Sequence, residues 1–189
     1  MPQVSEARLT VAIIGAGPLG RWLALSAARA GFQVLLEDVM PSNLHHAQEY
    51  IRLELGPASM SANSGSPVTF VSTIEDAVRS ADLVIDCVPD ELESKLEILW
   101  LLDRMSPPHA VLATPTLNLS IADLASCTYR PGQCIAIAVL PSLLVGHDWL
   151  PGTGLLLKAA PATTSATIDL ASEFWRALGF EPKVEVAED

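Results

Sequence analysis

Short apolar runs, each long enough for one buried strand, recur along the chain and alternate with amphipathic segments. The runs predict strands at Val11–Ile14, Gln33–Glu37, Val68–Val71, Leu83–Val88, Ala110–Thr114, Ile135–Leu140, Leu155–Leu157 and Lys183–Val186. Strands that are apolar along their whole length are typical of a parallel sheet covered on both faces.

The segments between these runs carry helical periodicity. One helix is predicted from Pro18 to Ala30, where Gly31 ends it, and Ser72-Thr-Ile-Glu75 resembles a capping box that opens a short helix. Further helices are predicted at Ser120–Ala125 and along three apolar faces: Leu44, Ala47, Ile51 and Leu55; Leu92, Leu96, Leu99 and Leu102; and Ile168, Ala171, Trp175 and Leu178, the last in a helix from about Thr164 to Leu178.

This alternation predicts an α/β fold, a Rossmann-type, doubly wound domain with a mostly parallel sheet. With 189 residues, the chain has the usual length of one domain, so we expect residues 1–189 to form a single unit. The segment from Gly56 to Pro67 is rich in Gly, Ser, Asn and Pro and is predicted to be an internal surface loop.

Composition narrows the function classes. Hydrophobic residues make up 50% of the chain and charged residues 17%, which excludes a disordered chain. No apolar run approaches the ~18 residues of a membrane-spanning helix. The net charge is -11 with scattered basic residues, so we expect no nucleic acid and no membrane surface as partner. Backbone dipoles would have to hold any bound phosphate.

Two further features concern location and redox state. The N-terminal sequence MPQVSEARLT has neither the basic nor the apolar region of a secretory signal, which predicts a cytoplasmic protein. Cys87, Cys127 and Cys134 form no C-x-x-C pair and lie in apolar segments. They are interpreted as reduced core thiols.

A glycine motif follows the first predicted strand and opens the first helix. Gly15-Ala-Gly17-Pro-Leu-Gly20 has the G-x-G-x-x-G spacing, in which the glycines allow a tight turn, a close approach of pyrophosphate and close helix packing. Pro18 suits the first helical turn, and the N–H groups of that turn, including those of Leu19 and Gly20, favour an anion. The motif predicts a dinucleotide site.

Asp38 ends the second predicted strand, where dinucleotide-binding domains carry an acid. Its carboxylate can accept hydrogen bonds from both ribose hydroxyl groups and would repel a 2′-phosphate. We therefore expect NAD(H) to be preferred over NADP(H).

Three motifs in this order resemble the NAD-binding domain of the 3-hydroxyacyl-CoA dehydrogenase family, within the β-hydroxyacid dehydrogenases that are similar to 6-phosphogluconate dehydrogenase. They are IIGAGPLGRWLALSAARAGFQVLLED, ADLVIDCVPDELESK and LATPTLNLSI, where the family has IGAGxMG, ADLVIEAVPEDLEVK and LATNTSSLSI. The final VEVAED is also similar to the family's exit from this domain.

The resemblance implies that Val88, Pro89, Asp90 and Lys95 line the nicotinamide half of the site. Two alternatives from local sequence stay open, in which Asp90 is a helix N-cap and Lys95 is an exposed helix lysine. Either alternative would remove that residue from the cofactor-binding set.

The catalytic part of the resemblance fails. The family's serine-containing turn reads Pro115-Thr-Leu-Asn118, and its HFFNP segment, which carries the catalytic His, reads Ile137-Ala-Val-Leu-Pro141. The segment expected to hold the orienting Glu reads Asp148-Trp-Leu-Pro151. Without a positioned base, a general-base contribution of ~10²–10⁴-fold is lost, so we assign no catalytic residue.

The four histidines of the chain are candidate substitutes for the missing base. His147 beside Asp148 is a conceivable base, although a surface loop is the favoured interpretation. His45 and His46 are neighbours on a helix and point ~100° apart, which suits no shared metal ion. His109 follows two prolines and is interpreted as an exposed turn residue. No metal site is predicted.

The family also carries a second, mostly helical domain after this one, and this sequence stops before it. Either the chain is a stand-alone cofactor domain or it is a shortened form of a longer protein. Because half of its residues are hydrophobic, we expect apolar surface to be covered by self-association, most simply in a homodimer.

Three functions remain open at this point. The favoured one is an NAD(H)-binding protein without the family's dehydrogenase catalysis, acting as a sensor, regulator or subunit. The first alternative is an active NAD-dependent oxidoreductase for a 3-hydroxyacyl-CoA or a small hydroxy acid, with an atypical or partner-supplied base. The second alternative is a structural or interaction protein with an empty site.

Overall fold

The computed structural model describes residues 9–56, 67–138 and 153–187. Its strands are β1 (Thr10–Ile14), β2 (Gln33–Glu37), β3 (Val68–Val71), β4 (Leu83–Asp86), β5 (Val111–Pro115), β6 (Cys134–Ala138), β7 (Thr153–Ala159) and β8 (Phe180–Val186). Its helices are α1 (Pro18–Arg29), α2 (Pro41–Leu55), α3 (Ile74–Val78), α4 (Leu92–Met105), α5 (Ile121–Ala125), α7 (Ser165–Ala177) and the 3₁₀ helix η2 (Pro131–Gln133).

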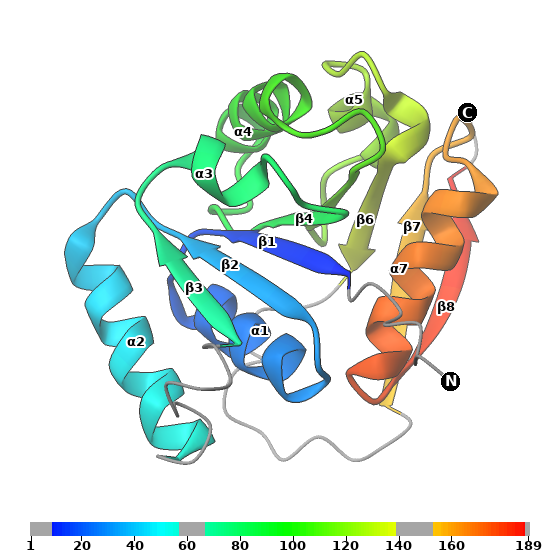
Figure 1. Ribbon diagram of the computed structural model, residues 1–189. Helices are drawn as coiled ribbons and strands as arrows, with labels where there is room; N and C mark the ends of the chain where they lie inside the picture. The colour runs from blue at the N-terminus through cyan, green and yellow to red at the C-terminus, as the bar shows by residue number, and fades with distance from the viewer. Residues whose placement is uncertain (1–8, 57–66, 139–152, 188–189) are drawn as a thin grey trace, which may run out of the picture.

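The strands form one sheet in the order β3-β2-β1-β4-β5-β6-β7-β8. Neighbouring strands from β3 to β6 are parallel, β7 is antiparallel to β6, and β8 is parallel to β7. The last pair is joined through α7, which makes a β-α-β unit at one edge of the sheet (Figure 1). The predicted doubly wound α/β fold with a mostly parallel sheet is confirmed.

Each face of the sheet has its own hydrophobic core, because successive strand side chains point to opposite faces. Val11 and Ile13 of β1 pack in the cluster that holds the apolar sides of α1, α2 and α7. Ala12 and Ile14 pack in the cluster of α3, α4 and α5. Helices therefore cover both faces, as strands apolar on both sides require.

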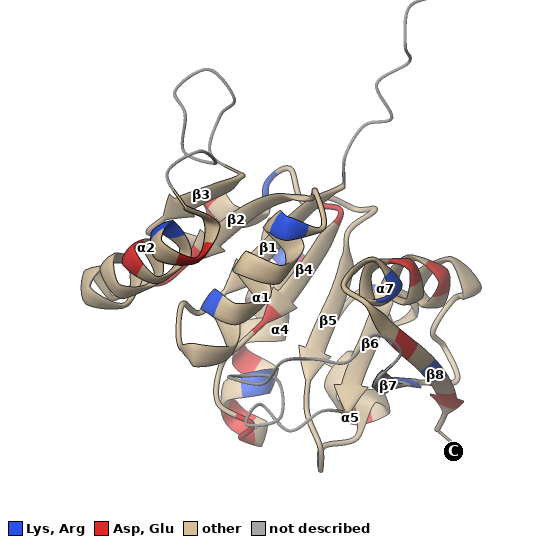
Figure 2. Cartoon of the chain, turned by 90° about the horizontal axis from the view of Figure 1, so that it is seen from below, with Lys and Arg blue, Asp and Glu red and all other residues tan. Residues whose placement is uncertain are grey.

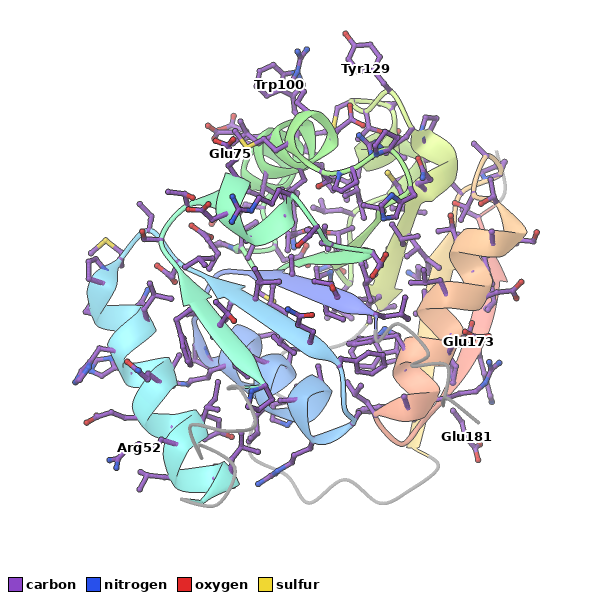
Figure 3. The ribbon with its side chains drawn as sticks, in the orientation of Figure 1. Arg52, Glu75, Trp100, Tyr129, Glu173 and Glu181 are labelled. Carbon is purple, nitrogen blue, oxygen red and sulfur yellow. The ribbon has the colours of Figure 1, made fainter. Side chains whose placement is uncertain are left out.

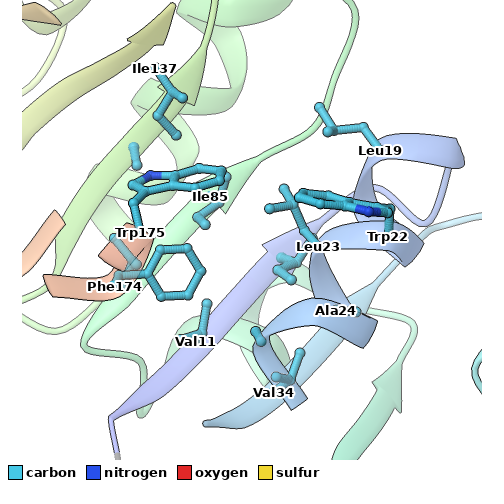
Figure 4. Close-up of a cluster of buried hydrophobic side chains, with 14 of the residues drawn as sticks. Val11, Leu19, Trp22, Leu23, Ala24, Val34, Ile85, Ile137, Phe174 and Trp175 are labelled. Carbon is cyan, nitrogen blue, oxygen red and sulfur yellow. The ribbon is translucent and has the colours of Figure 1, made fainter. Parts of the chain in front are cut away.

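Aromatic residues fill the core between α1 and α7. The ring centroids of Phe174 and Trp175 lie 5.5 Å apart in an edge-to-face arrangement, and Trp175 lies 5.2 Å from Phe180. Trp22 of α1 also meets Phe180 edge-on. Figure 4 shows these tryptophans packed above β1 with Leu19 and Leu23. This packing joins the β7-α7-β8 unit to the rest of the sheet.

Most predicted elements are present, with local corrections in two helices. The capping box is displaced by one residue, since Thr73 caps α3 by accepting a hydrogen bond from the N–H of Asp76. Leu92 is 49% exposed, so the apolar face predicted for its helix is rotated. The buried residues of α4 are Lys95, Ile98, Leu99, Leu102 and Asp103.

Strand ends also differ from expectation. β4 stops at Asp86 rather than Val88, and β8 begins at Phe180 rather than Lys183. Residues 57–66 of the predicted loop, and the last two residues of the predicted strand Ile135–Leu140, lie outside the described residues.

Membrane and redox expectations can be compared with the described segments. None of the helices there is long and apolar enough to cross a membrane. Cys87, Cys127 and Cys134 are free thiols, and burial raises the pKa of Cys134 to about 11. In Figure 2 the Lys and Arg positions are spread over separate elements. Charged side chains labelled in Figure 3, such as Arg52 and Glu173, point outward.

Candidate functional site

The candidate site lies at the end of β1, where the strand order of the sheet reverses. β2 and β3 lie on one side of β1, and β4 and the following strands lie on the other. β1 pairs with β2 on one side and β4 on the other, so the connections after β1 and β4 leave in opposite directions. In open α/β sheets the crevice at the carboxyl ends of such strands is the usual ligand site. The glycine loop after β1 lies in this place.

The glycines of this loop are required by its geometry. Gly15 has φ of 102°, which side chains with a Cβ rarely adopt, and its N–H donates to the carbonyl of Glu37 at 2.8 Å. A Cβ on Gly20 would lie 1.7 Å from the Gly15 carbonyl oxygen, so only glycine allows α1 to approach the loop this closely. A Cβ on Gly17 would meet no atom within 4 Å, which leaves open space beside the backbone.

The N-terminus of α1 provides the electrostatic part of the site. Gly17 is the N-cap and makes no side-chain capping bond, and Pro18 occupies the first turn. The N–H groups of Leu19 and Gly20 are therefore first-turn donors at the positive end of a twelve-residue helix. The Leu19 side chain packs in the core, so this residue can contribute through its backbone. Loop and helix fit a pyrophosphate.

Asp38 is held beside the loop by hydrogen bonds from the protein. Its Oδ2 accepts from the Ala16 N–H at 2.8 Å and from the Asn43 amide at 3.0 Å, and its Oδ1 accepts from the Met40 N–H at 2.8 Å. A carboxylate has about four acceptor positions. One therefore remains for a ribose hydroxyl group, which narrows the expectation that Asp38 binds both hydroxyls.

A pocket of about 380 Å³ opens between these groups. Its lining combines the glycine loop with residues after β2 and β4 and one residue each from α3 and α4: Ile14, Gly15, Gly17, Glu37, Asp38, Val39, Asn43, Ile74, Cys87, Val88, Pro89 and Ile98. Val88 and Pro89 thus lie beside the glycine loop in this crevice, and their place at the nicotinamide stays a prediction.

Asp90 connects the loop after β4 to the turn after β5. Its carboxylate accepts a hydrogen bond from the Leu117 N–H at 3.1 Å. The N-cap of α4 is Glu91, which makes no side-chain capping bond, so the alternative that Asp90 caps this helix is wrong. Thr116 fixes the same turn, since its Oγ1 accepts from the Leu119 N–H.

Lys95 is buried under α4 and forms an ion pair. Its Nζ lies 2.5 Å from Oδ1 of Asp86, and the two side chains are 1% and 0% exposed. Burial raises the pKa of the Asp86 carboxyl, while the Lys95 ammonium opposes that rise. The alternative of an exposed helix lysine is wrong. Lys95 is also absent from the lining of the pocket, because its ammonium is directed to Asp86.

The other sequence candidates lie apart from this pocket or beyond the described segments. His147 and Asp148 fall in residues 139–152, which the structure does not describe. His45 lies 3.7 Å from Glu49 on α2, and His109 lies 3.2 Å from Asp82. Within the described ranges, no three His, Cys, Asp or Glu residues come together as a metal-binding group.

Sequence reasoning missed several residues of the pocket, and four of them shape it: Glu37, Asn43, Ile74 and Ile98. Asn43 binds Asp38 from the first turn of α2, and Ile74 and Ile98 provide an apolar wall. Glu37 was included only as the end of a strand, although a charged residue closing an apolar strand is a signal that could have identified it. The others come from helices whose placement depends on tertiary packing.

Comparison with known proteins gives the same picture. The model of the 3-hydroxyacyl-CoA dehydrogenase NAD-binding domain matches residues 10–139. A probable 3-hydroxybutyryl-CoA dehydrogenase of Bacillus subtilis is 32% identical over 135 residues, covering 67% of this chain and 47% of the relative. A Mesorhizobium japonicum 5-formyl-3-hydroxy-2-methylpyridine 4-carboxylate 5-dehydrogenase is 31% identical over 182 residues, covering 92% and 56%.

A solved structure agrees. The 3-hydroxyacyl-CoA dehydrogenase of Archaeoglobus fulgidus superposes with a TM-score of 0.78 at 27% identity and covers 96% of this chain and 58% of its own. The chain spans about half the length of the curated relatives it matches. Loop geometry, sheet order and sequence agree, and the chain belongs to the 3-hydroxyacyl-CoA dehydrogenase family through its NAD-binding domain.

Proposed function

We propose that this chain binds NAD(H) in the pocket after β1 and acts as a sensor, regulator or subunit, without the family's hydroxyl-dehydrogenation chemistry. The glycine loop and the α1 N-terminus hold the pyrophosphate, and Asp38 lies at the adenosine ribose. The carrying observation is the 1.7 Å approach that a Cβ at Gly20 would make to the Gly15 carbonyl oxygen. This close packing is the feature that presents the helix N-terminus to a phosphate.

The end of β6 supports the second part of the proposal. Ile137 and Ala138 end β6 where the resemblance places the family's catalytic His. A secondary alcohol loses its proton only to a positioned base, and neither side chain can accept one. Val88 and Pro89 are the proposed cofactor contacts at the nicotinamide side. Asp90 and Lys95 act there indirectly, through the hydrogen bond to Leu117 and the buried ion pair with Asp86.

The test is a binding titration followed by an activity assay. Calorimetry is expected to show binding of NAD⁺ and NADH and weaker binding of NADP⁺. NADH oxidation with acetoacetyl-CoA at neutral pH and saturating cofactor is expected to stay far below the usual enzymatic range of ~1–10³ s⁻¹. Turnover within that range would refute the non-catalytic role and favour an oxidoreductase with an atypical base. A His147→Ala variant would then show whether His147 is that base.

Self-association is the proposed partner interaction. Large apolar side chains are exposed on several elements, among them Val186 of β8 at 55% and Trp100 of α4 at 45%, and Figure 3 shows Trp100 and Tyr129 projecting outward. Exposed apolar groups of this kind favour burial against a second copy. A mass of 20.1 kDa by light scattering at all micromolar concentrations would contradict a homodimer. The cytoplasmic location and the absence of a nucleic-acid partner stay predictions.

A further inference from the structure

Glu37 is a buried acid at the end of an otherwise apolar strand. It pairs in register with Ile14 of β1 and Val71 of β3, and its side chain lies on the face of the sheet that α3 and α4 cover. Only 5% of the residue is exposed. The residue lines the pocket together with Ile74 and Ile98, which lie on the same face of the sheet.

The Glu37 carboxyl group has no hydrogen bond or ion pair with any residue that the structure describes. Its backbone carbonyl is used, since it accepts from the Gly15 N–H. A largely buried polar side chain without a protein partner is unfavourable unless water or a ligand supplies the missing bonds. The position of this acid in a ligand pocket therefore indicates a binding role.

The surroundings of Glu37 favour its neutral form. Burial, and secondarily the charge of Asp38, raise its pKa to about 7. The other titratable groups of the pocket lining are Asp38 and Cys87, and burial raises the pKa of the Cys87 thiol. β1, α3 and α4 contribute only Ile14, Ile74 and Ile98 to the lining. The nearby cation of α4, Lys95, is paired with Asp86.

The pocket also indicates which part of a dinucleotide reaches Glu37. Gly17 and Asp38 mark the pyrophosphate and the adenosine ribose under the proposed function, on which this inference rests. The same lining includes the apolar residues Ile74 and Ile98, and an apolar wall suits a flat aromatic base. Adenine carries, on adjacent positions, a ring nitrogen that accepts and a 6-amino group that donates a hydrogen bond.

We propose that Glu37 is the adenine-recognising residue of this chain, binding the base as a neutral acid. Its O–H donates to a ring nitrogen, and its carbonyl oxygen accepts from the 6-amino group. An ionised carboxylate has no proton for the ring nitrogen and loses one of the two bonds. Adenosine-end affinity therefore falls when Glu37 ionises, while the pyrophosphate contacts stay unchanged.

The experiment measures the dissociation constant of ADP-ribose by calorimetry at pH 6 and pH 8.5. For the unsubstituted chain we expect affinity to fall about tenfold between these values, the effect of about one hydrogen bond. Glu37→Gln keeps one donor and one acceptor without titrating, so its affinity is expected to be nearly independent of pH. Glu37→Leu is expected to bind about tenfold more weakly at pH 6 and to show no comparable pH dependence.

Two controls assign the effect to the base. Glu49→Gln removes one carboxylate from the exposed surface of α2 and is expected to leave the pH dependence of binding unchanged. An ADP-ribose analogue with purine in place of adenine lacks the 6-amino group. The unsubstituted chain is expected to bind this analogue more weakly than ADP-ribose, whereas Glu37→Leu is expected to bind the two compounds with equal affinity. Circular dichroism and thermal unfolding establish that each variant is folded.

The outcomes separate this inference from the proposed function. If the unsubstituted chain binds neither NAD⁺ nor ADP-ribose, both are overturned. If it binds them, but Glu37→Gln and Glu37→Leu keep its pH dependence and its preference for the 6-amino group, the dinucleotide site stands and the role of Glu37 is wrong.

Discussion

The two sides of the candidate site are built on different principles. At the ends of β1 and β2, backbone N–H groups and open space beside Gly17 face the pocket, and the Glu37 carboxyl group has no partner among the described residues. At the ends of β4 and β5, the side chains that could bind a ligand are bonded to the protein, since Asp90 accepts from Leu117 and Lys95 pairs with Asp86. The proposed adenosine side presents hydrogen-bonding groups to a ligand, whereas Asp90 and Lys95 on the opposite side are bonded to other protein groups.

This difference has a physical origin. A phosphate site made from glycines and a helix terminus depends on backbone geometry, which tolerates side-chain change elsewhere. Proton abstraction depends on one positioned base, and the positions that match the family's motif are apolar at Ile137 and Ala138. Under the proposed function, this chain keeps the cofactor-binding part of the family's chemistry without the proton-abstracting part.

The largest expected effect concerns the buried ion pair of Lys95 and Asp86. Lys95→Met leaves the Asp86 carboxylate buried without its partner and is expected to lower the free energy of unfolding by about 3–5 kcal/mol. The double variant Lys95→Met with Asp86→Leu removes both charges and is expected to recover most of that loss. Urea unfolding measures both. Lys183→Met, at an exposed position of β8, is the matched control, and an equal loss there would contradict the role of the buried pair.

The next effect concerns the glycine loop. Gly20→Ala places a Cβ 1.7 Å from the Gly15 carbonyl oxygen, so α1 and the loop must separate. NAD⁺ affinity is expected to fall about tenfold to a hundredfold, as measured by calorimetry. Gly154→Ala on β7 has no atom within 4 Å of its new Cβ and is expected to bind as before. Unchanged NAD⁺ affinity of Gly20→Ala would show that the pyrophosphate does not bind at this loop.

Cofactor choice is expected to depend on Asp38. In Asp38→Ala the carboxylate that faces a 2′-phosphate is gone, so the preference for NAD⁺ over NADP⁺ is expected to decrease about tenfold. The ratio of the two dissociation constants is the measurement, because losses of affinity common to both cofactors cancel in it. A ratio equal to that of the unsubstituted chain would show that the ribose lies elsewhere.

The smallest effect is the influence of Glu37 on stability without ligand. Its pKa of about 7 lies above the ordinary value, so the folded chain holds this proton more tightly than the unfolded chain. Its stabilising contribution is present below about pH 4.5 and is lost as pH rises to about 7.

Thermal unfolding at pH 5 and pH 8 measures that contribution. The measured quantity is the free energy of unfolding of Glu37→Gln minus that of the unsubstituted chain. This difference is expected to be more favourable to Glu37→Gln at pH 8 than at pH 5, by on the order of 1 kcal/mol. Glu49→Gln is the control for removing one charge. A difference that does not vary with pH would place Glu37 in contact with water rather than in a dry pocket.

Much of the adenosine half could be predicted from local sequence. Gly15, Gly17 and Gly20 act through a strand-turn-helix unit in which every required residue is near in the chain, so spacing alone identifies it. The doubly wound sheet could also be predicted from local sequence. Each strand is apolar because both of its faces are buried, and each helix carries one apolar stripe that packs on the sheet.

Tertiary structure alone decided the partners of the buried charges. Nothing local indicates that Lys95 of α4 meets Asp86, or that Asp90 binds the turn containing Leu117, since these contacts form only when β4, β5 and α4 pack together. The apolar residues of α4 predicted a buried face that included Leu92, but the ion pair turns Lys95 inward and leaves Leu92 exposed. Hydrophobic periodicity identifies a buried helix face from its apolar side chains alone. It cannot identify a charged side chain that is buried because an oppositely charged partner is buried with it.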